Sequence, residues 1–171
     1  KVKIMNFKKL NCISENIDLQ DYYKLYDFVR DNMKHPEWLG YIPINETKII
    51  LSKGGKIWLY YDNDNLVCSM FYIPSNNESL RKHNLEYDEN ETGSLGPIMV
   101  NPYYVGKGYM REMLAIFNEY NKSIHNKYIF TKAASDNLYS IRNIENDGYK
   151  LVDVYKNNRG LNNAYLKELD Y

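Results

Sequence analysis

The stretch Val100-Asn-Pro-Tyr-Tyr-Val-Gly-Lys-Gly-Tyr-Met-Arg-Glu-Met-Leu114 places two glycines between a short apolar run and an amphipathic pattern. The apolar run, residues 95–100, predicts a strand, and the pattern that follows Gly108 predicts a helix. The first turn of such a helix has backbone N–H groups without intrahelical acceptors and the positive end of the helix dipole. Gly106 and Gly108 lack the Cβ atoms that would keep a phosphate away from those groups. The stretch therefore predicts a phosphate-ester site, with a simple strand-to-helix turn as the alternative.

The segments that follow extend this unit. Apolar residues recur at helical spacing after the glycines, at Tyr109, Met113, Ile116, Phe117, Tyr120 and Ile124. Residues 128–134 then form an apolar run that predicts a buried strand. The order strand, helix, strand predicts two neighbouring parallel strands joined by a right-handed crossover.

The C-terminal part predicts one more helix and a hairpin. Ser135 or Asp136 caps a helix over residues 137–147, and Gly148 stands at its C-terminal stop position. Strands over residues 149–155 and 161–169 flank the turn sequence Asn-Asn-Arg-Gly.

The N-terminal part begins with weak strand character over residues 2–7 and continues with a helix. Asp18 is the predicted N-cap, and the sequence His35-Pro36 ends the pattern. The apolar stripe of this helix predicts core packing and consists of Leu19, Tyr22, Tyr23, Tyr26, Val29 and Met33.

The middle of the chain predicts a pocket wall, a short helix, a hairpin and a loop. Residues 37–43 have turn residues and aromatic side chains suited to one wall of a pocket, and Asn45 caps a short helix that ends at Gly54-Gly55. Residues 56–61 and 66–73 predict an antiparallel pair around Asp-Asn-Asp-Asn. Residues 74–92 predict a polar loop with one turn of helix.

Composition indicates one domain over residues 1–171 and excludes disordered and fibrous proteins. Lys plus Arg equals Asp plus Glu at 22 each, so the formal charge is zero and nucleic acid is not expected as a partner. Cys12 and Cys68 are predicted to be buried apolar side chains, and no Cys/His cluster has metal-ligand spacing. We expect no metal, no membrane segment and a cytoplasmic location.

Two blocks of the sequence resemble the GNAT superfamily of acyl-CoA-dependent N-acetyltransferases. The first is Val100-x-Pro-x-Tyr-x-Gly-Lys-Gly108, which is similar to the pyrophosphate loop of that family. The second is Ala134-Ser-Asp-Asn-Leu-Tyr-Ser-Ile-Arg142 followed by Gly148-Tyr149. The resemblance implies an α/β (α+β) fold, with a mixed, mostly antiparallel sheet that has a central parallel strand pair and is flanked by helices. It also implies acetyl-CoA or CoA as the co-substrate.

The resemblance further implies which residues bind CoA. Backbone amides of the glycine loop hold the pyrophosphate, the strand backbone of residues 98–100 pairs with the pantetheine arm, and Asn137 bonds the arm directly or through water. The implied cofactor-binding residues are Ile98, Met99, Val100, Val105, Gly106, Lys107, Gly108, Tyr109, Met110, Asn137 and Ser140.

Two positions of the loop depart from the family pattern. Val105 stands where the family usually has Arg or Gln, and Met110 stands where it has Gly or Ala. The first departure removes a side-chain contact but leaves the backbone amides. The Met110 side chain can point away from the phosphates at a helix start.

A third departure concerns catalysis, because Ile144 stands where many relatives have a Tyr that protonates the departing thiolate. Three residues are the remaining candidates for acid–base roles: Tyr139 as the nearest phenol, and Ser94 and Glu91 at the preceding strand. For each of these three residues, a purely structural role is the alternative interpretation. Positioning of the amine against the thioester lowers the barrier without such a group.

The expected function is the transfer of an acetyl group from acetyl-CoA to a primary amine by direct attack, with the Val100 amide polarising the carbonyl. The acceptor is a small molecule or a peptide and lies between the N-terminal helices, the loop over residues 74–92 and the last hairpin. The alternatives are a catalytically silent CoA-binding sensor domain and a structural domain without a ligand. The identity of the acceptor and a homodimeric state are left open.

Overall fold

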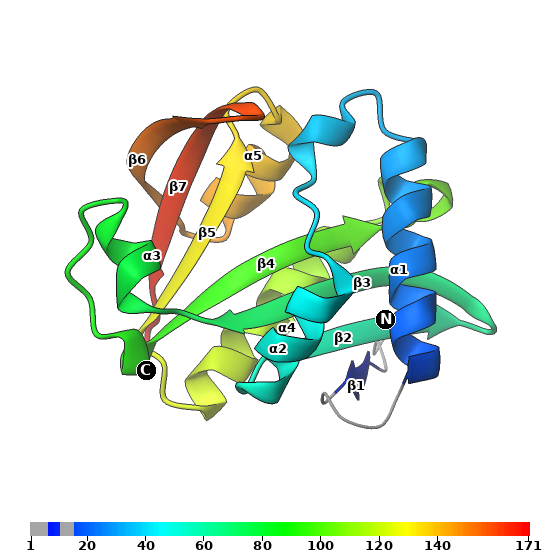
Figure 1. Cartoon of the computed structure of the whole chain (residues 1–171), viewed down its shortest axis with the longest axis horizontal. Coiled ribbons are helices and arrows are strands. Elements are labelled where there is room, and N and C mark those ends of the chain that lie inside the picture. The colour runs from blue at the N-terminus through cyan, green and yellow to red at the C-terminus, as the bar shows by residue number, and fades with distance from the viewer. Residues whose placement is uncertain (1–6, 11–15) are drawn as a thin grey trace.

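A computed structural model describes residues 7–10 and 16–171, which form one seven-stranded sheet with the order β1-β2-β3-β4-β5-β7-β6 (Figure 1). The strands are β1 (Phe7–Leu10), β2 (Lys56–Asp62), β3 (Asn65–Pro74), β4 (Thr92–Val100), β5 (Tyr128–Ala134), β6 (Lys150–Asn157) and β7 (Gly160–Glu168). The β4–β5 pair is parallel and all other neighbouring pairs are antiparallel. The predicted mixed sheet with a central parallel pair is confirmed.

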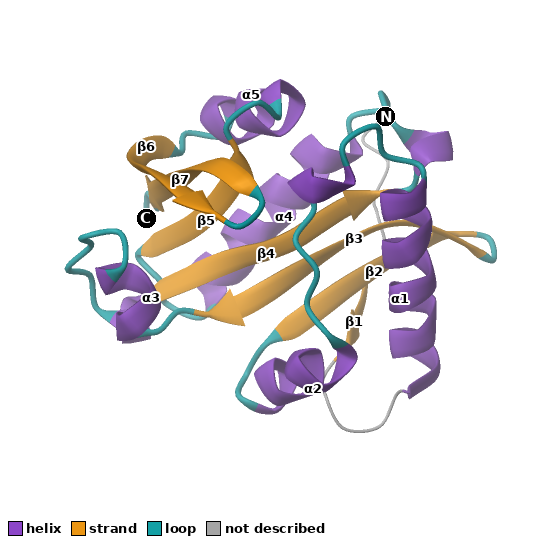
Figure 2. Ribbon diagram, turned by 45° about the horizontal axis from the view of Figure 1, so that its top comes forward, coloured by secondary structure: helices purple, strands orange, loops and turns teal. Residues whose placement is uncertain are grey.

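Helices cover both faces of this sheet (Figure 2). They are α1 (Asn16–Asp31), α2 (Ile44–Ser52), α3 (Asn77–Arg81), α4 (Tyr109–Ser123) and α5 (Leu138–Asn146), with single 3₁₀ turns η1 (Pro36–Trp38), η2 (Glu89–Glu91) and η3 (Pro102–Tyr104). Among the residues described, no helix is long and apolar enough to cross a membrane.

The two faces of β2 show how the core is divided. Ile57 and Leu59 pack in a cluster with the apolar stripe of α1, whereas Trp58 and Tyr60 pack in a second cluster with α4. Side chains of a strand alternate between the faces, so one short segment contributes to both layers. The predicted α1 stripe is therefore core: four of its members are buried, Leu19, Tyr22, Tyr26 and Val29.

Most of the other predicted elements are also confirmed. Both hairpins, β2–β3 and β6–β7, are present, and the loop over residues 74–92 contains the short α3. Gly148 has φ +94°, as expected for a helix stop, and Cys68 is buried. The strand predicted over residues 2–7 overlaps the described part only at Phe7, and Cys12 lies outside it.

Three predicted helix caps are wrong. Helix α1 begins at Asn16, so Asp18 lies within its first turn, and α2 begins after Pro43, whose carbonyl accepts from the Thr47 amide at 2.9 Å. Asn45 therefore lies inside α2.

The cap of α5 is Asn137, because its Oδ1 accepts from the Ser140 amide at 3.3 Å. The hydroxyl of Ser135 instead donates to Asn163 Oδ1 on β7 at 2.7 Å. Neither Ser135 nor Asp136 caps the helix.

Candidate active site

The centre of the sheet opens where β4 and β5 separate. The two strands pair only at three positions, Thr92 to Ser94 with Tyr128 to Phe130, and then diverge (Figure 1). We call this opening the β4–β5 fork. At its closed end the Thr131 hydroxyl donates to the carbonyl of Leu95 at 3.2 Å. Beyond it, the edge of β4 that faces β5 has no β5 partner, which leaves it available for an extended ligand added like a strand.

A bulge in β4 lies just past the point of separation. Met70 of β3 pairs with Ile98 and Tyr72 pairs with Leu95, so two residues of β4 lie opposite one residue of β3. Such a bulge bends a strand and re-aims its backbone groups. It accompanies the turn of β4 away from β5.

The glycine loop stands at the open end of the fork, between β4 and α4. Gly106 has φ +77° and Gly108 has φ +81°, which is backbone that side-chain-bearing residues rarely adopt. A Cβ atom at Gly106 would meet no heavy atom within 4 Å, and Gly108 forms the N-cap of α4 without a side-chain capping bond. The first amides of α4 are therefore open toward a ligand, and the loop fits an anionic phosphate group.

The side chains beside this loop leave its backbone accessible. Met110 is buried in the core against the sheet, so its side chain points away from the loop, as expected. Val105 is 57% exposed and contributes no polar contact. The ammonium of Lys107 lies 5.2 Å from the centre of the Tyr104 ring.

A second helix N-terminus stands at the same edge of the sheet. Because β4 and β5 are parallel, α4 and α5 both begin beyond the carboxyl ends of adjacent strands. At the start of α5, Asn137 Nδ2 donates to Ser140 Oγ at 3.0 Å. The two predicted CoA-binding residues thus contact each other at the end of β5.

The three candidate acid–base residues occupy different environments. Ser94 lies on the last paired rung of the fork, opposite Phe130, and its hydroxyl shares a hydrogen bond of 2.6 Å with Ser75. Tyr139 is on the first turn of α5 and is 54% exposed. Ile144 is buried and apolar, so no phenol stands at that position.

Glu91 ends η2 and directly precedes β4. Its carboxylate forms an ion pair of 2.7 Å with Lys127, and this hydrogen bond raises the pKa of the Lys127 ammonium. The carboxylate precedes the closed end of the fork, whereas Ser94 lies at the point where the strands part. The structure therefore brings Ser94, and not Glu91, to the fork.

A buried histidine near the fork was missed by sequence reasoning. His83 is 6% exposed, and its Nδ1 lies 2.8 Å from Asp153 Oδ2 on β6. The imidazole packs against the rings of Phe130 and Tyr155, at 5.3 and 4.6 Å between ring centres. The pair joins segments seventy residues apart, for which the sequence has no local signal.

The segment before α2 is fixed over α1 by tyrosine hydroxyls. Tyr23 donates to the carbonyl of Ile42 at 2.6 Å, and Tyr26 donates to the carbonyl of Gly40. Burial raises the pKa of the Tyr26 hydroxyl, which keeps this donor protonated. The ring of Tyr41 lies 5.1 Å from the Arg30 guanidinium carbon.

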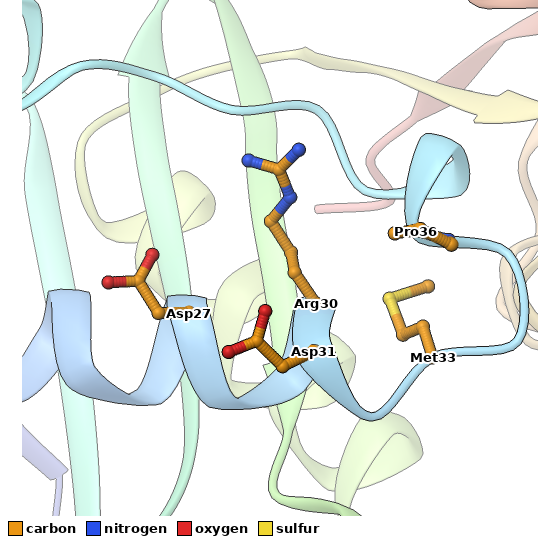
Figure 3. A pocket seen from close by; sticks show the side chains of 5 residues that line it. All are labelled: Asp27, Arg30, Asp31, Met33 and Pro36. Carbon is orange, nitrogen blue, oxygen red and sulfur yellow. The ribbon is translucent and has the colours of Figure 1, made fainter.

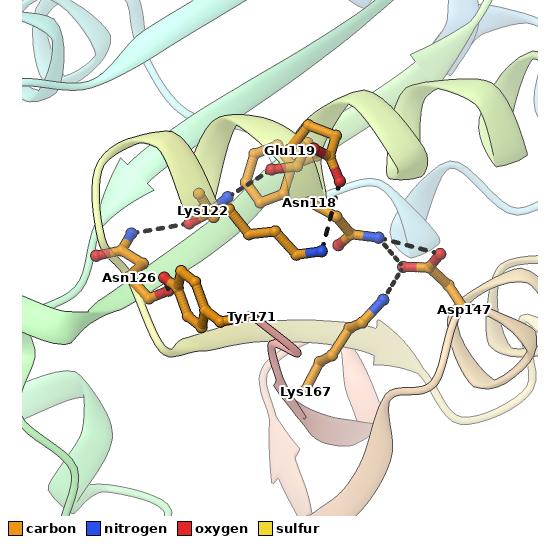
Figure 4. A network of polar contacts seen from close by, with 9 residues as sticks. Asn118, Glu119, Lys122, Asn126, Asp147, Lys167 and Tyr171 are labelled. Carbon is orange, nitrogen blue, oxygen red and sulfur yellow. Dashed lines mark hydrogen bonds and ion pairs between the residues drawn. The ribbon is translucent and has the colours of Figure 1, made fainter.

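Two surface hollows lie outside the fork. Figure 3 shows the first, along the end of α1, lined by Asp27, Arg30, Asp31, Met33 and Pro36. The second lies beside the network of Figure 4, where Asp147 accepts from Asn118 and pairs with Lys167 at 3.0 Å. That network ties α4 to β7 and to the end of α5. No cluster of His, Cys, Asp or Glu suited to a metal occurs in residues 7–10 and 16–171.

Comparison with known proteins identifies the architecture. No family model and no curated protein sequence matches this chain. Among solved structures, a probable acetyltransferase from Staphylococcus epidermidis ATCC 12228 is similar with a TM-score of 0.74 and 19% identity over 98% of this chain and 100% of that one. Spermidine N-acetyltransferase from Vibrio cholerae, solved with CoA and spermine, has a TM-score of 0.69 and 15% identity over 96% and 95%.

The Escherichia coli ribosomal-protein-S18-alanine N-acetyltransferase is also similar, with a TM-score of 0.67 and 13% identity over 98% of this chain and 96% of that one. A further match is described as a putative acetyltransferase of the GNAT family. The chain thus has the GNAT acetyltransferase fold over almost its whole length.

Proposed function

We propose that this chain is a single-domain, acyl-CoA-dependent N-acetyltransferase that transfers the acetyl group of acetyl-CoA to a primary amine. The observation that carries the proposal is the β4–β5 fork, whose open edge of β4 leads directly to the glycine loop and the uncapped start of α4. A similar structure, the Vibrio cholerae enzyme, was solved with CoA. That ligand combines an extended arm with a pyrophosphate, which is the pair of features that the fork and the loop fit.

The residues that hold CoA in this proposal belong to three elements. The amides from Gly106 to Met110 receive the pyrophosphate, the β4 backbone over residues 98–100 pairs with the pantetheine arm, and Asn137 with Ser140 contacts the arm from α5. Backbone groups supply most of these contacts, so the exposed Val105 is compatible with binding.

The reaction is direct aminolysis of the thioester. The neutral acceptor amine attacks the carbonyl carbon, a C–N bond forms, and the C–S bond breaks to release the thiolate. The Val100 amide donates to the carbonyl oxygen as negative charge develops there. The ammonium proton passes to water, which the Ser94 hydroxyl orients from the last rung of the fork.

Protonation of the thiolate has no phenol at the Ile144 position. General acid catalysis contributes about 10² to 10⁴ in rate, so the chain depends on orientation of the amine for a larger share of its rate enhancement. Tyr139, on the first turn of α5, is an exposed phenol five residues before that position, whereas Tyr149, five residues after it, is buried.

The second candidate function is a CoA-binding sensor domain without turnover. Two observations favour it: Ile144 is buried and apolar, and the Glu91 carboxylate is engaged by Lys127. In this alternative the chain binds CoA but does not catalyse acetyl transfer.

Calorimetric titration with acetyl-CoA, followed by thiol-release assays over a panel of amines, tests both functions. An enzyme binds acetyl-CoA and releases thiol in an amine-dependent way, and a sensor binds but does not turn over. Absence of binding at millimolar acetyl-CoA contradicts both.

A further inference from the structure

Cationic side chains gather on the sheet face opposite α4, just beyond the β4–β5 fork. Phe130 packs on this face, whereas its neighbour Ile129 packs in the α4 cluster. Since side chains alternate along a strand, Lys132 shares the face of Phe130, and its Nζ lies 5.9 Å from the centre of the Phe130 ring. Phe130 forms the last β4–β5 rung with Ser94, so Lys132 is the first residue of β5 on this face beyond that rung.

A second cation approaches from the β6–β7 turn. The guanidinium of Arg159 lies against Gly40, so that a Cβ atom at Gly40 would be only 2.8 Å from Arg159 Nη1. The hairpin of Arg159 lies on the β5 side of the fork, and Gly40 belongs to the segment that Tyr26 fixes on α1, which covers β3 and β4. This contact therefore bridges the two sides of the fork.

These two cations have no counter-ion within the described part of the chain. Other basic side chains do have one: Lys82 pairs with Glu78 at 3.5 Å and Lys167 pairs with Asp147 at 3.0 Å. Neither Lys132 nor Arg159 forms an ion pair with a described residue.

Lys132 is an exposed residue that lies beside the Phe130 ring. Burial lowers the pKa of the Lys132 ammonium, and the charges of Lys82 and Arg159 lower it further. Nearby like charges disfavour the charged form of an ammonium unless an anion compensates them. An anion bound between Lys132 and Arg159 would supply that compensation.

We propose that the acceptor amine carries an oxyanion, either a carboxylate or a phosphate ester, and that Lys132 and Arg159 bind this group beside the β4–β5 fork. The inference rests on the proposed function, because it names the substrate class that the site acetylates. A guanidinium binds the two oxygens of such a group through parallel N–H bonds, and an ammonium adds a point charge. The same cations repel an acceptor that carries only positive charge.

Matched acceptors test the inference. Alanine is compared with alaninamide, and O-phosphoethanolamine with ethanolamine, by thiol release from acetyl-CoA, with spermidine as a purely cationic acceptor. We expect kcat/KM to be about tenfold or more higher for the charged member of at least one pair, since hydrogen bonds to charged groups are worth about 1.5 to 3 kcal/mol. The preferred pair distinguishes a carboxylate from a phosphate. Equal rates within both pairs, or a preference for spermidine, overturn the inference.

Variants that remove one charge each test whether Lys132 and Arg159 cause the preference for acceptors with an oxyanion. Lys132→Met and Arg159→Met should each lower kcat/KM for the charged acceptor by about tenfold and leave its uncharged partner unchanged. Lys24→Met, which removes an exposed lysine of α1, is the matched control and should keep the preference. A preference that survives both substitutions at the fork contradicts the assignment.

Two binding measurements separate this inference from the proposed function. Calorimetric affinity for acetyl-CoA should be the same in all these proteins, and its absence from the wild type defeats the proposed function. The oxyanion site is then judged with inorganic phosphate: the rise in Tm should be larger for the wild type than for the Lys132→Met/Arg159→Met variant. Equal rises overturn the inference whether or not any acceptor is acetylated.

Discussion

Nδ1 of His83 lies 2.8 Å from Oδ2 of Asp153, and this contact fixes the loop after α3 to β6 beside the fork. His83 is buried while Asp153 is partly exposed. The imidazole also contacts two aromatic rings, those of Phe130 and Tyr155. The pair thus supports the floor of the proposed acceptor region.

His83→Ala should lower the free energy of unfolding by about 3 kcal/mol, because it removes a packed ring and leaves the Asp153 carboxylate without its partner. Asp153→Asn keeps an acceptor for the ring N–H and should cost only about 1 kcal/mol. Urea unfolding of the two variants measures both values. Equal losses would show that the contact is not the main contribution of His83.

Gly108→Val should weaken acetyl-CoA binding by about tenfold or more, whereas Lys107→Ala should change it little. The valine must adopt φ +81° at the N-cap of α4, which distorts the amides that receive the pyrophosphate. Gly54→Val is the matched control, since Gly54 has φ +98° at the end of α2, away from the loop. Calorimetry on the three variants checks the order, and a larger effect of Lys107→Ala would assign the contact to the side chain.

Ser94→Ala should lower kcat by about 10²-fold if its hydroxyl orients the proton-accepting water. Glu91→Gln should change kcat by less than about twofold, because its carboxylate forms an exposed ion pair with Lys127. Tyr139→Phe removes the only other candidate group and should also stay near the wild-type rate. Steady-state kinetics with saturating acetyl-CoA decide among them, and a loss confined to Tyr139→Phe would transfer the role to that phenol.

The thiol of Cys68 should be unreactive in the folded protein. Burial raises its pKa to about 12, and the charge of Glu112 adds to this effect. At pH 8 the thiolate fraction is about a thousandfold below that of a free cysteine. A Cys12→Ser variant, which leaves Cys68 as the one cysteine of the chain, should therefore react with Ellman's reagent only after unfolding in urea. Rapid reaction of the native variant would contradict the burial of this side chain, and would also add background to thiol-release assays.

Local signals in the sequence predicted the elements around the fork. The glycines of residues 106–108 stand after an apolar strand, and the turn Asn-Asn-Arg-Gly separates two apolar runs, so position along the chain was enough to assign them. The cap of α5 is not specified by the sequence alone, because Ser135, Asp136 and Asn137 are all good capping residues in consecutive positions. The folded structure separates them, because Asn137 accepts from the Ser140 amide while the Ser135 hydroxyl donates to Asn163 of β7.

The acceptor side could not be predicted, because its contacts join distant segments. Arg159 meets Gly40 across the fork, and His83 meets Asp153 on β6. In the sequence Arg159 is only part of a hairpin turn and Lys132 is only an interruption of an apolar strand. The proposed role of Lys132 and Arg159 depends on where β4 and β5 separate, and no local sequence pattern specifies that position.

Asn137 has two roles that substitutions can separate. Its Oδ1 caps α5 through the Ser140 amide, and the side-chain amide is the group proposed to contact the pantetheine arm. Asn137→Ala should lose both and cost about 1 kcal/mol of stability. Asn137→Ser retains a capping oxygen but has no amide, so it should restore the Tm while leaving acetyl-CoA affinity reduced by about tenfold. If Asn137→Ser restores the affinity together with the Tm, Asn137 acts only by starting the helix, and the arm must be held by the β4 edge of the fork and the glycine loop alone.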